Sequence, residues 1–187
     1  LPTNPSAVKV KVSLSKQRTY VMEGSEVLLA MPVSVGAPGS VTPTGNFTIF
    51  NKVEKKRANT HGYAYSGNQI KKTMLSSRPS GWSFKGTPMP YWCEFKANYG
   101  FHTGWVKHTP CTHGCIRMHE NLAPKFYRLV KVGTPVNNEH GLVGRVVGAP
   151  PNVSRLLLLT DVASRTPVLV DRSDARAIDL SKPLLLS

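Results

Sequence analysis

The chain of 187 residues has few acidic residues and no long apolar run. Asp and Glu together number 10 against 24 Lys and Arg, which gives a formal net charge of +14. A surplus this large favours an acidic partner over a neutral one. The longest aliphatic run, Leu156 to Leu159, is far shorter than the roughly 20 apolar residues that a bilayer requires. We therefore expect no membrane span in this chain.

Cysteine is also scarce. The three residues Cys93, Cys111 and Cys115 are too few for a disulfide framework, and their odd number leaves at least one as a free thiol, a metal ligand or an intermolecular partner. The chain begins with Leu1 and has no basic and apolar leader, which fits an exported protein whose signal has been removed. Its 40% apolar residues are enough for the core of one ordinary domain.

Short alternating runs bounded by turn residues predict a mainly β fold. We expect strands in Val8–Val12, Val27–Val35 and Asn46–Phe50 and, nearer the C-terminus, in Gly141–Val147, Arg155–Thr160 and Val168–Val170. One amphipathic helix is expected from about Asn121 to a stop at Gly133. The polar and basic stretch from Asn51 to Gly86 predicts long surface loops beside a binding cleft.

One segment, from Tyr91 to Met118, holds all three cysteines and three of the six histidines. A thiol becomes a nucleophile when a nearby imidazole takes its proton, and Cys115 has such candidates in His113, His102 and His108. A sharp turn at Gly114 would aim backbone N–H groups at a developing oxyanion, so the composition suits acyl transfer through a thioester.

Two other interpretations of this segment stay open. Cysteine and histidine are both common as buried structural residues. A zinc site is the sharper rival, because four soft ligands of suitable kinds are present: Cys111, His113, Cys115 and His102. The C-x-H-x-C spacing is nevertheless tighter than that of the usual zinc knuckle, and a zinc site explains neither Gly114 nor Arg117.

The segment resembles the L,D-transpeptidase (YkuD-type) catalytic domain. The matching motifs are a histidine followed by Thr and Gly, at His102–Gly104, and, after a spacer, the run Thr112-His-Gly-Cys-Ile-Arg-Met118. The run at 41–49, the segment at 89–91 and that at 133–136 also resemble parts of the family, so the likeness covers about residues 8 to 138. It implies packed mixed β-sheets with one main helix after the cysteine motif.

By this resemblance, Cys115 is the nucleophile and His102 the general acid and base, with the backbone of Thr103 orienting the imidazole. Tyr91 and the N–H groups of His113, Gly114 and Cys115 would form the oxyanion site. Arg117 and Thr112 are assigned to substrate binding, Arg117 because its fork of donors suits a carboxylate. The resemblance implies no metal and no cofactor.

The implied reaction remodels peptidoglycan outside the cytoplasmic membrane, in the periplasm or at the cell wall. Cys115 would form a thioester with the third residue of a tetrapeptide stem, release D-Ala and pass the acyl group to an amine. That amine belongs to another stem, to a D-amino acid or to a lipoprotein, and carbapenems are expected to acylate the same thiol. Two alternatives are a carboxypeptidase or amide hydrolase that uses water, and a cell-wall interaction module without turnover.

Two further expectations concern the remaining cysteines and the tail. Cys93 and Cys111 stand outside the family pattern and are expected to pair in a disulfide, to trap Cys115 or to stay buried as thiols. Residues 139–187 contain runs that resemble a strand segment of the rod-shape protein MreC. We therefore expect a catalytic domain at 7–138 and a β-rich extension at 139–187, which packs on that domain or adds strands to it, with a cell-elongation complex as a partner. Wall polymers are acidic, so the basic surplus does not require nucleic acid.

Overall fold

The computed structural model describes residues 1–139, 144–148 and 154–158. It confirms a mainly β chain with one α-helix. The strands are β1 (Val8–Ser13), β2 (Arg18–Glu23), β3 (Glu26–Ser34), β4 (Gly45–Thr48), β5 (Asn51–Val53), β6 (Arg57–Ser66), β7 (Gln69–Met74), β8 (Ser83–Pro88), β9 (Trp92–Lys96), β10 (Tyr99–Thr103), β11 (Ile116–Met118), β12 (Pro135–Glu139), β13 (Gly144–Gly148) and β14 (Ser154–Leu158). The helix is α1 (Ala123–Leu129), and two 3₁₀ turns are η1 (Pro5–Ala7) and η2 (Leu75–Ser77).

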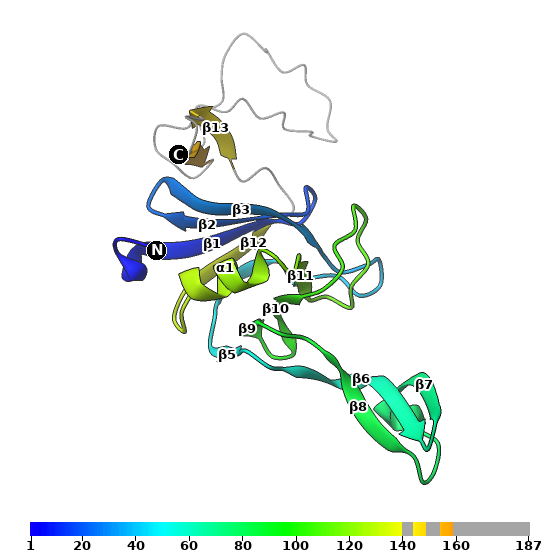
Figure 1. The fold of residues 1–187 in the computed structure, drawn as a ribbon. Coiled ribbons are helices and arrows are strands. Elements are labelled where there is room, and N and C mark those ends of the chain that lie inside the picture. The colour runs from blue at the N-terminus through cyan, green and yellow to red at the C-terminus, as the bar shows by residue number, and fades with distance from the viewer. Residues whose placement is uncertain (140–143, 149–153, 159–187) are drawn as a thin grey trace, which may run out of the picture.

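Nine strands form the continuous path of the main sheet in the order β4-β12-β1-β2-β3-β11-β10-β9-β5 (Figure 1). The pairs β1–β12 and β10–β11 are parallel, whereas the other neighbours on this path are antiparallel. The sheet is therefore mixed, as the sequence predicted. The predicted strands at the N-terminus are confirmed with small shifts of their ends.

The core lies between the sheet and α1. In β1 the alternation of valines places Val8, Val10 and Val12 in the core. From α1, Phe126 packs on Phe101 of β10, with ring centroids 4.6 Å apart. The helix is shorter than predicted: its N-cap is Leu122 rather than Asn121, whose N–H donates to the His119 ring.

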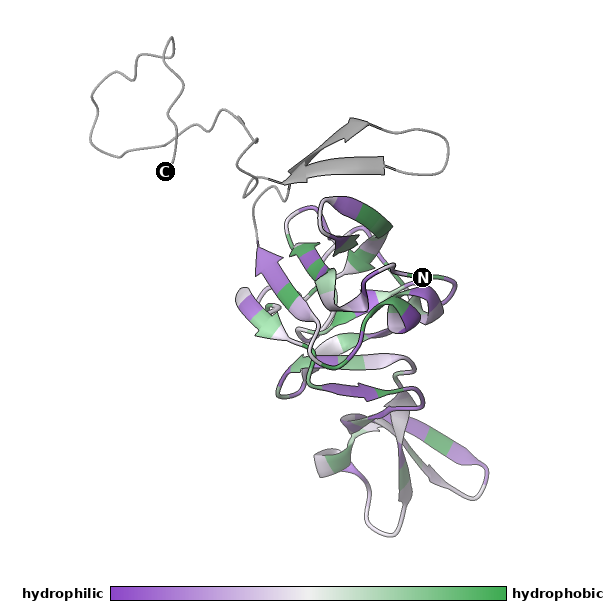
Figure 2. Cartoon of the chain, turned by 90° about the vertical axis from the view of Figure 1, so that its left-hand side faces the viewer, coloured by the Kyte–Doolittle hydropathy of each residue, from purple (hydrophilic) through white to green (hydrophobic). Residues whose placement is uncertain are grey.

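The prediction of long loops over residues 51–86 is wrong. This stretch forms β5 and then a second, three-stranded antiparallel sheet in the order β7-β6-β8, which extends away from the main sheet (Figure 1). We call residues 57–88 the arm. The sequence concealed these strands because most of their side chains are exposed and polar, so apolar and polar positions do not alternate clearly (Figure 2).

The tail is described only in part. β13 pairs with β14, and β14 pairs antiparallel with the start of β3. The two predicted strands Gly141–Val147 and Arg155–Thr160 correspond to these elements, so this hairpin adjoins the main sheet. The predicted strand Val168–Val170 lies outside the described residues. None of the described helices is long and apolar enough to span a membrane.

Candidate active site

The register of three strands places the predicted residues on one face of the main sheet. In the parallel β10–β11 pair, Phe101 lies beside Ile116 and His102 beside Arg117. One step back in this register brings Cys115 beside Gly100, so Cys115, His102 and Arg117 share a face. Strand β9 adds Trp92 and Glu94 to this surface, which we call the polar face.

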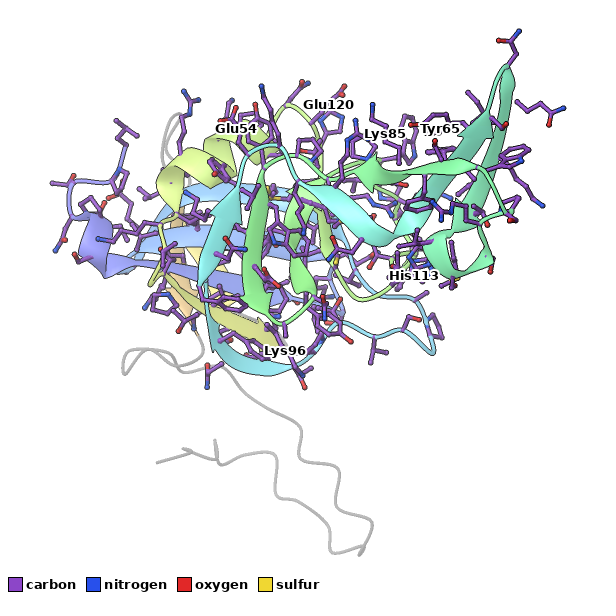
Figure 3. All side chains as sticks on the ribbon, turned by 90° about the horizontal axis from the view of Figure 1, so that it is seen from below. Glu54, Tyr65, Lys85, Lys96, His113 and Glu120 are labelled. Atoms are coloured by element: carbon purple, nitrogen blue, oxygen red, sulfur yellow. The ribbon has the colours of Figure 1, made fainter. Side chains whose placement is uncertain are left out.

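The opposite face carries the core. Phe101 and Ile116 alternate with the residues of the polar face and are fully buried beneath α1. The division of the two faces therefore follows directly from the strand period of two. Figure 3 shows the side chains of the sheet viewed along this region, with His113 near the junction between the main sheet and the arm.

The thiol of Cys115 sits against the turn between β9 and β10. Its Sγ lies 3.8 Å from the carbonyl oxygen of Asn98, to which the thiol donates, and it accepts a hydrogen bond from the N–H of Gly100. A side chain at Gly100 would have its Cβ 2.8 Å from the Cys93 carbonyl and 2.9 Å from the Trp92 ring. Glycine at position 100 thus allows the Trp92 indole to pack directly against the backbone that holds the sulfur.

Glu94 fixes the turn that holds the sulfur. Its carboxylate accepts hydrogen bonds from the N–H of Asn98 at 3.0 Å, from the Asn51 amide at 3.1 Å and from the Trp92 indole at 3.2 Å. Burial raises the pKa of Glu94, but these three hydrogen bonds outweigh that effect and leave it below its ordinary value. The anion therefore braces both the turn and the indole.

His102 is held in one tautomer. Its Nδ1 lies 2.8 Å from the carbonyl oxygen of Thr103, so Nδ1 carries the hydrogen and Nε2 is left as the basic nitrogen. Thr103 is fixed in turn, because its N–H and its hydroxyl both donate to the carbonyl of Pro90. Burial lowers the pKa of His102 to about 4, the Thr103 hydrogen bond opposes this shift, and the Arg117 charge adds to it.

The pKa of Cys115 is raised, chiefly by burial, although the Gly100 N–H and the Arg117 charge both lower it. Together with the lowered pKa of His102, this shift disfavours a resting thiolate beside an imidazolium. Burial disfavours both charged forms, so the pair rests as a neutral thiol and a neutral imidazole.

The loop before Cys115 is closed by Thr112. The buried Thr112 hydroxyl accepts from the N–H of Gly114 at 3.2 Å and donates to the carbonyl of Cys115 at 2.6 Å. Gly114 has a φ of +104°, and a Cβ there would meet the Tyr99 ring at 2.4 Å. Only glycine fits this turn. The N–H of Gly114 points at Thr112, which is a position the motif alone did not predict.

Arg117 lies over the loop that follows β10. Its stem packs on Gly104, where a Cβ would come within 2.6 Å of the Arg117 Cδ. Its guanidinium donates to the carbonyl of Trp105 at 3.2 Å and lies 3.9 Å from the sulfur of Cys111. The ring of Trp105 is 77% exposed at this edge of the polar face, a feature that the sequence analysis did not single out.

Tyr91 and Cys93 both contact the core side of the main sheet. The ring of Tyr91 makes an edge contact with Tyr127 of α1, with centroids 5.6 Å apart. Cys93 also faces the core, fully buried, and pairs in register with Lys52, while burial raises its pKa to about 12. The sequence motif alone did not show that Cys93 lies on the face of the sheet opposite Cys115.

All three cysteines are free thiols in this structure, so the predicted disulfide between Cys93 and Cys111 is absent. The zinc alternative also finds no support in the described part of the chain, where no three His, Cys, Asp or Glu side chains group closely enough to hold a metal ion. His113 instead stacks on His61 of β6, with ring centroids 4.8 Å apart. Sequence analysis did not predict this contact, because the two histidines are 52 positions apart in the chain and only the fold brings their rings together.

Lys52 belongs to the structure rather than to a solvated basic surface. Its ammonium donates to the carbonyls of Tyr127 at 2.6 Å and Val130 at 2.5 Å, at the C-terminal end of α1, and lies 4.0 Å from the centre of the Tyr127 ring. It thereby satisfies helix carbonyls that have no partner within the helix.

A surface pocket bounded by β1, β4 and β12 includes none of the residues around Cys115.

Comparisons with known proteins agree with this fold. The family model described as L,D-transpeptidase catalytic domain, YkuD, matches residues 7–137, and that of the MreC barrel core matches residues 128–183. The fold is similar to an L,D-transpeptidase from Mycobacterium smegmatis, with 22% identity, 71% of this chain and 58% of that one covered and a TM-score of 0.55. An L,D-transpeptidase from Xylanimonas cellulosilytica gives 17% identity, coverage of 73% and 62%, and a TM-score of 0.55.

The tail has a separate relative. A cell shape-determining protein MreC from Caulobacter vibrioides is 69% identical over 51 residues, which are 27% of this chain and 15% of that protein. The MreC of Haemophilus influenzae is 49% identical over 47 residues, 25% of this chain and 13% of that protein. The chain thus spans only a small part of these curated relatives and somewhat over half of the solved transpeptidase chains.

Proposed function

Because the chain belongs to the YkuD family of L,D-transpeptidase catalytic domains, we propose that it is a cysteine acyltransferase acting on peptidoglycan stem peptides. The observation that carries this proposal is the shared face of β10 and β11. There the Cys115 thiol and an imidazole with a basic Nε2 lie on adjacent strands, and Arg117 stands beside them. Arginine suits a carboxylate of the bound stem.

In the first half-reaction the thiol hydrogen leaves the Asn98 carbonyl by rotation about the Cβ–Sγ bond and passes to Nε2 of His102. The sulfur attacks the carbonyl of the third stem residue and forms a C–S bond. The tetrahedral intermediate then collapses, the amide C–N bond breaks, and His102 gives its proton to the departing D-Ala. The product is a thioester on Cys115 together with free D-Ala.

In the second half-reaction an acceptor amine attacks the thioester. Its proton goes to Nε2 of His102, the C–S bond breaks and the sulfur regains the proton. The neutral resting pair suits this sequence, because the imidazole can accept a proton at the start of each half-reaction and return it at the end. The proposed oxyanion site consists of the N–H groups of His113 and Cys115, and Gly114 shapes the turn between them. We leave Tyr91 out of this site because its ring contacts Tyr127.

The partners and location follow from the chemistry. We place the site of action outside the cytoplasmic membrane, where stem peptides are found, with another stem, a D-amino acid or a lipoprotein as the acceptor. We further propose that residues 7–138 form the catalytic domain and 139–187 an extension whose likeness to MreC links the enzyme to cell elongation. Pairing of β14 with β3 supports an extension that continues the main sheet.

The test compares two thiol-to-methyl changes. Cys115→Ala is expected to abolish D-Ala release from a soluble tetrapeptide stem, whereas Cys111→Ala, whose sulfur lies by Arg117, should retain most of it. Release of D-Ala is measured by mass spectrometry, and circular dichroism confirms that both variants fold. Undiminished turnover in Cys115→Ala would refute the assignment. Analysis of the acyl product in the same assay separates transfer to an amine from hydrolysis.

A carbapenem provides an independent probe, since one similar transpeptidase structure is a complex with imipenem. We expect incubation with imipenem to add one drug mass to the chain, and peptide mapping to place it on Cys115. Cys111→Ala should be labelled equally. An adduct that persists in Cys115→Ala would point to another nucleophile.

A further inference from the structure

The arm differs in charge from the rest of the chain. Between Glu54 and Glu94 the sequence has no Asp or Glu, and within the arm it has five cations. These are Arg57, Lys71, Lys72, Arg78 and Lys85. A surface with one sign of charge over a whole sheet attracts polyanions and repels cations.

One face of the arm is also rich in exposed apolar side chains. The alternation of β6 places His61, Tyr63 and Tyr65 on the same side of the strand, while Gly62 and Ala64 point to the buried side. Tyr63 and Tyr65 are 41% and 42% exposed. We call the side that carries these tyrosines the tyrosine face.

The register adds the neighbours of each tyrosine. Lys72 of β7 and Lys85 of β8 flank Tyr63, so one cross-strand line reads cation, aromatic ring, cation. Ile70, which is 74% exposed, lies beside Tyr65. Figure 3 shows Tyr65 and Lys85 together on the arm. Aromatic rings between cations offer stacking surface and countercharge to one ligand.

The tyrosine face leads to the proposed active site. His61, two positions before Tyr63 on β6, stacks on His113, and His113 is two positions before Cys115. From His61 to Tyr65 the strand extends about 13 Å. A ligand that occupies the proposed active site can therefore continue along this face if it is a polymer.

We propose that the tyrosine face binds the glycan strand of peptidoglycan next to the stem held at Cys115. This inference rests on the proposed function and extends it to a part of the substrate that does not react. The ring faces of Tyr63 and Tyr65 pack on the apolar faces of sugar rings, while Lys72 and Lys85 bind carboxylates of neighbouring stems. The arm then favours polymeric over free stems.

The distribution of the apolar side chains favours a polymer over a lipid surface. A hairpin tip that inserts into a bilayer must be apolar, because unpaired polar groups are costly in hydrocarbon. Here the turn itself, Gly67 and Asn68, and the pair Ser66 and Gln69 that closes it are polar or small. Tyr65 and Ile70 lie next to this tip and Tyr63 lies two positions nearer His61, so the exposed side chains form a row along the strand.

The test measures co-sedimentation of the full chain with purified peptidoglycan sacculi. The charge-reversed pair Lys72→Glu with Lys85→Glu is expected to weaken binding about tenfold or more. The matched control is the double variant Lys71→Glu with Arg78→Glu, which changes the net charge equally. Neither residue lies on the tyrosine face: Lys71 pairs with buried Ala64 and points to the other side of β7, and Arg78 follows η2. It should bind nearly as the unaltered chain does. Equal loss in both pairs would overturn the proposal, because bulk charge would then explain binding.

The aromatic part is tested in the same assay. Tyr63→Ala should reduce sacculus binding several-fold, whereas Phe50→Ala, at an aromatic residue that is 52% exposed outside the arm, should not. If neither change reduces binding, the tyrosine face is not the glycan site. Co-sedimentation with phosphatidylglycerol vesicles provides the opposing arm. Loss of vesicle binding in the Lys72/Lys85 pair with unchanged sacculus binding would assign the face to a membrane and overturn the proposal.

Catalysis is kept separate from binding. All binding measurements are repeated in the Cys115→Ala background, so they do not depend on turnover. D-Ala release from a soluble tetrapeptide should be unchanged in the Lys72/Lys85 and Tyr63 variants. If the chain binds sacculi through the arm but never releases D-Ala, only the proposed function is refuted. If the chain shows full turnover and its arm variants bind sacculi normally, only this inference is refuted.

Discussion

At the scale of single residues, burial decides the protonation state of the proposed catalytic pair. His102 is only 8% exposed, and its pKa of about 4 keeps the imidazole neutral at neutral pH. Burial also raises the pKa of Cys115. The proposed reaction therefore starts from two neutral groups, with His102 as the proposed general base, and not from a preformed ion pair.

This state predicts an unusual pH dependence. The acid limb of kcat/KM for D-Ala release should follow His102 and fall only as the pH approaches about 4, because the base stays unprotonated above that value. The profile is measured with the soluble tetrapeptide from pH 3.5 to 8. A limb centred near 6.5, the ordinary histidine value, would contradict a buried neutral base.

The same residue links folding to pH. Between about pH 6.5 and 4 the unfolded chain takes up a proton at His102 and the folded chain does not, so the free energy of unfolding decreases as the pH falls through this window. The loss approaches about 3 kcal/mol near pH 4. Urea unfolding at pH 7 and 4.5 checks this, and His102→Gln should lose this part of the dependence.

The charges of Glu94 and Arg117 shift the pKa of the Cys115 thiol in opposite directions. The Glu94 charge raises the pKa of Cys115, and the Arg117 charge lowers it. At a fixed pH near 8, alkylation of Cys115 by iodoacetamide should therefore be faster in Glu94→Gln and slower in Arg117→Gln, measured by peptide mapping. Glutamine at 94 retains an acceptor for the Asn98 N–H, so the turn is kept. Equal rates in both variants would show that neither charge acts on the sulfur.

At the scale of elements, the turn at Gly114 sets the position of the sulfur. We expect Gly114→Ala to destabilise the fold by about 2–4 kcal/mol and to reduce turnover, because the added Cβ meets the Tyr99 ring and the φ is positive. Gly133→Ala is the matched control: its φ is +95° but its Cβ would meet nothing within 4 Å. It should cost about 1 kcal/mol.

The two variants are compared by urea unfolding and by D-Ala release. Equal destabilisation at Gly114 and Gly133 would mean that the Tyr99 contact is unimportant. Full turnover in a folded Gly114→Ala protein would show that the turn does not position Cys115.

The elements also show what the sequence predicts well and what it does not. Strands with one buried face, such as β1 with its alternating valines, are visible from their period of two. The strands of the arm were missed because the buried side of β6 carries only the small residues Gly62 and Ala64, while its larger rings are exposed, and because their pairing is fixed by contacts that a local pattern does not contain. Proximity to the motif in sequence likewise does not fix which face of the sheet a side chain takes: Cys93, in the same segment as Cys115, is buried on the opposite face.

At the scale of the whole molecule, the charge is unevenly placed. The arm carries five cations and has no Asp or Glu at all. The proposed active site lies where the main sheet meets this basic arm, and the stacked pair of His61 and His113 joins them. Composition predicted an acidic partner, but only the fold shows that the basic arm meets the main sheet at His113, two residues before Cys115.

The central claim is that Cys115 carries the acyl group. It is tested most directly by mixing the full chain with a tetrapeptide donor in the absence of any acceptor, quenching with acid and measuring the intact mass. We predict a mass increase equal to the donor minus D-Ala, mapped to Cys115 and absent from His102→Gln at the same time point. No increase, or the same increase in Cys115→Ala, would contradict the account.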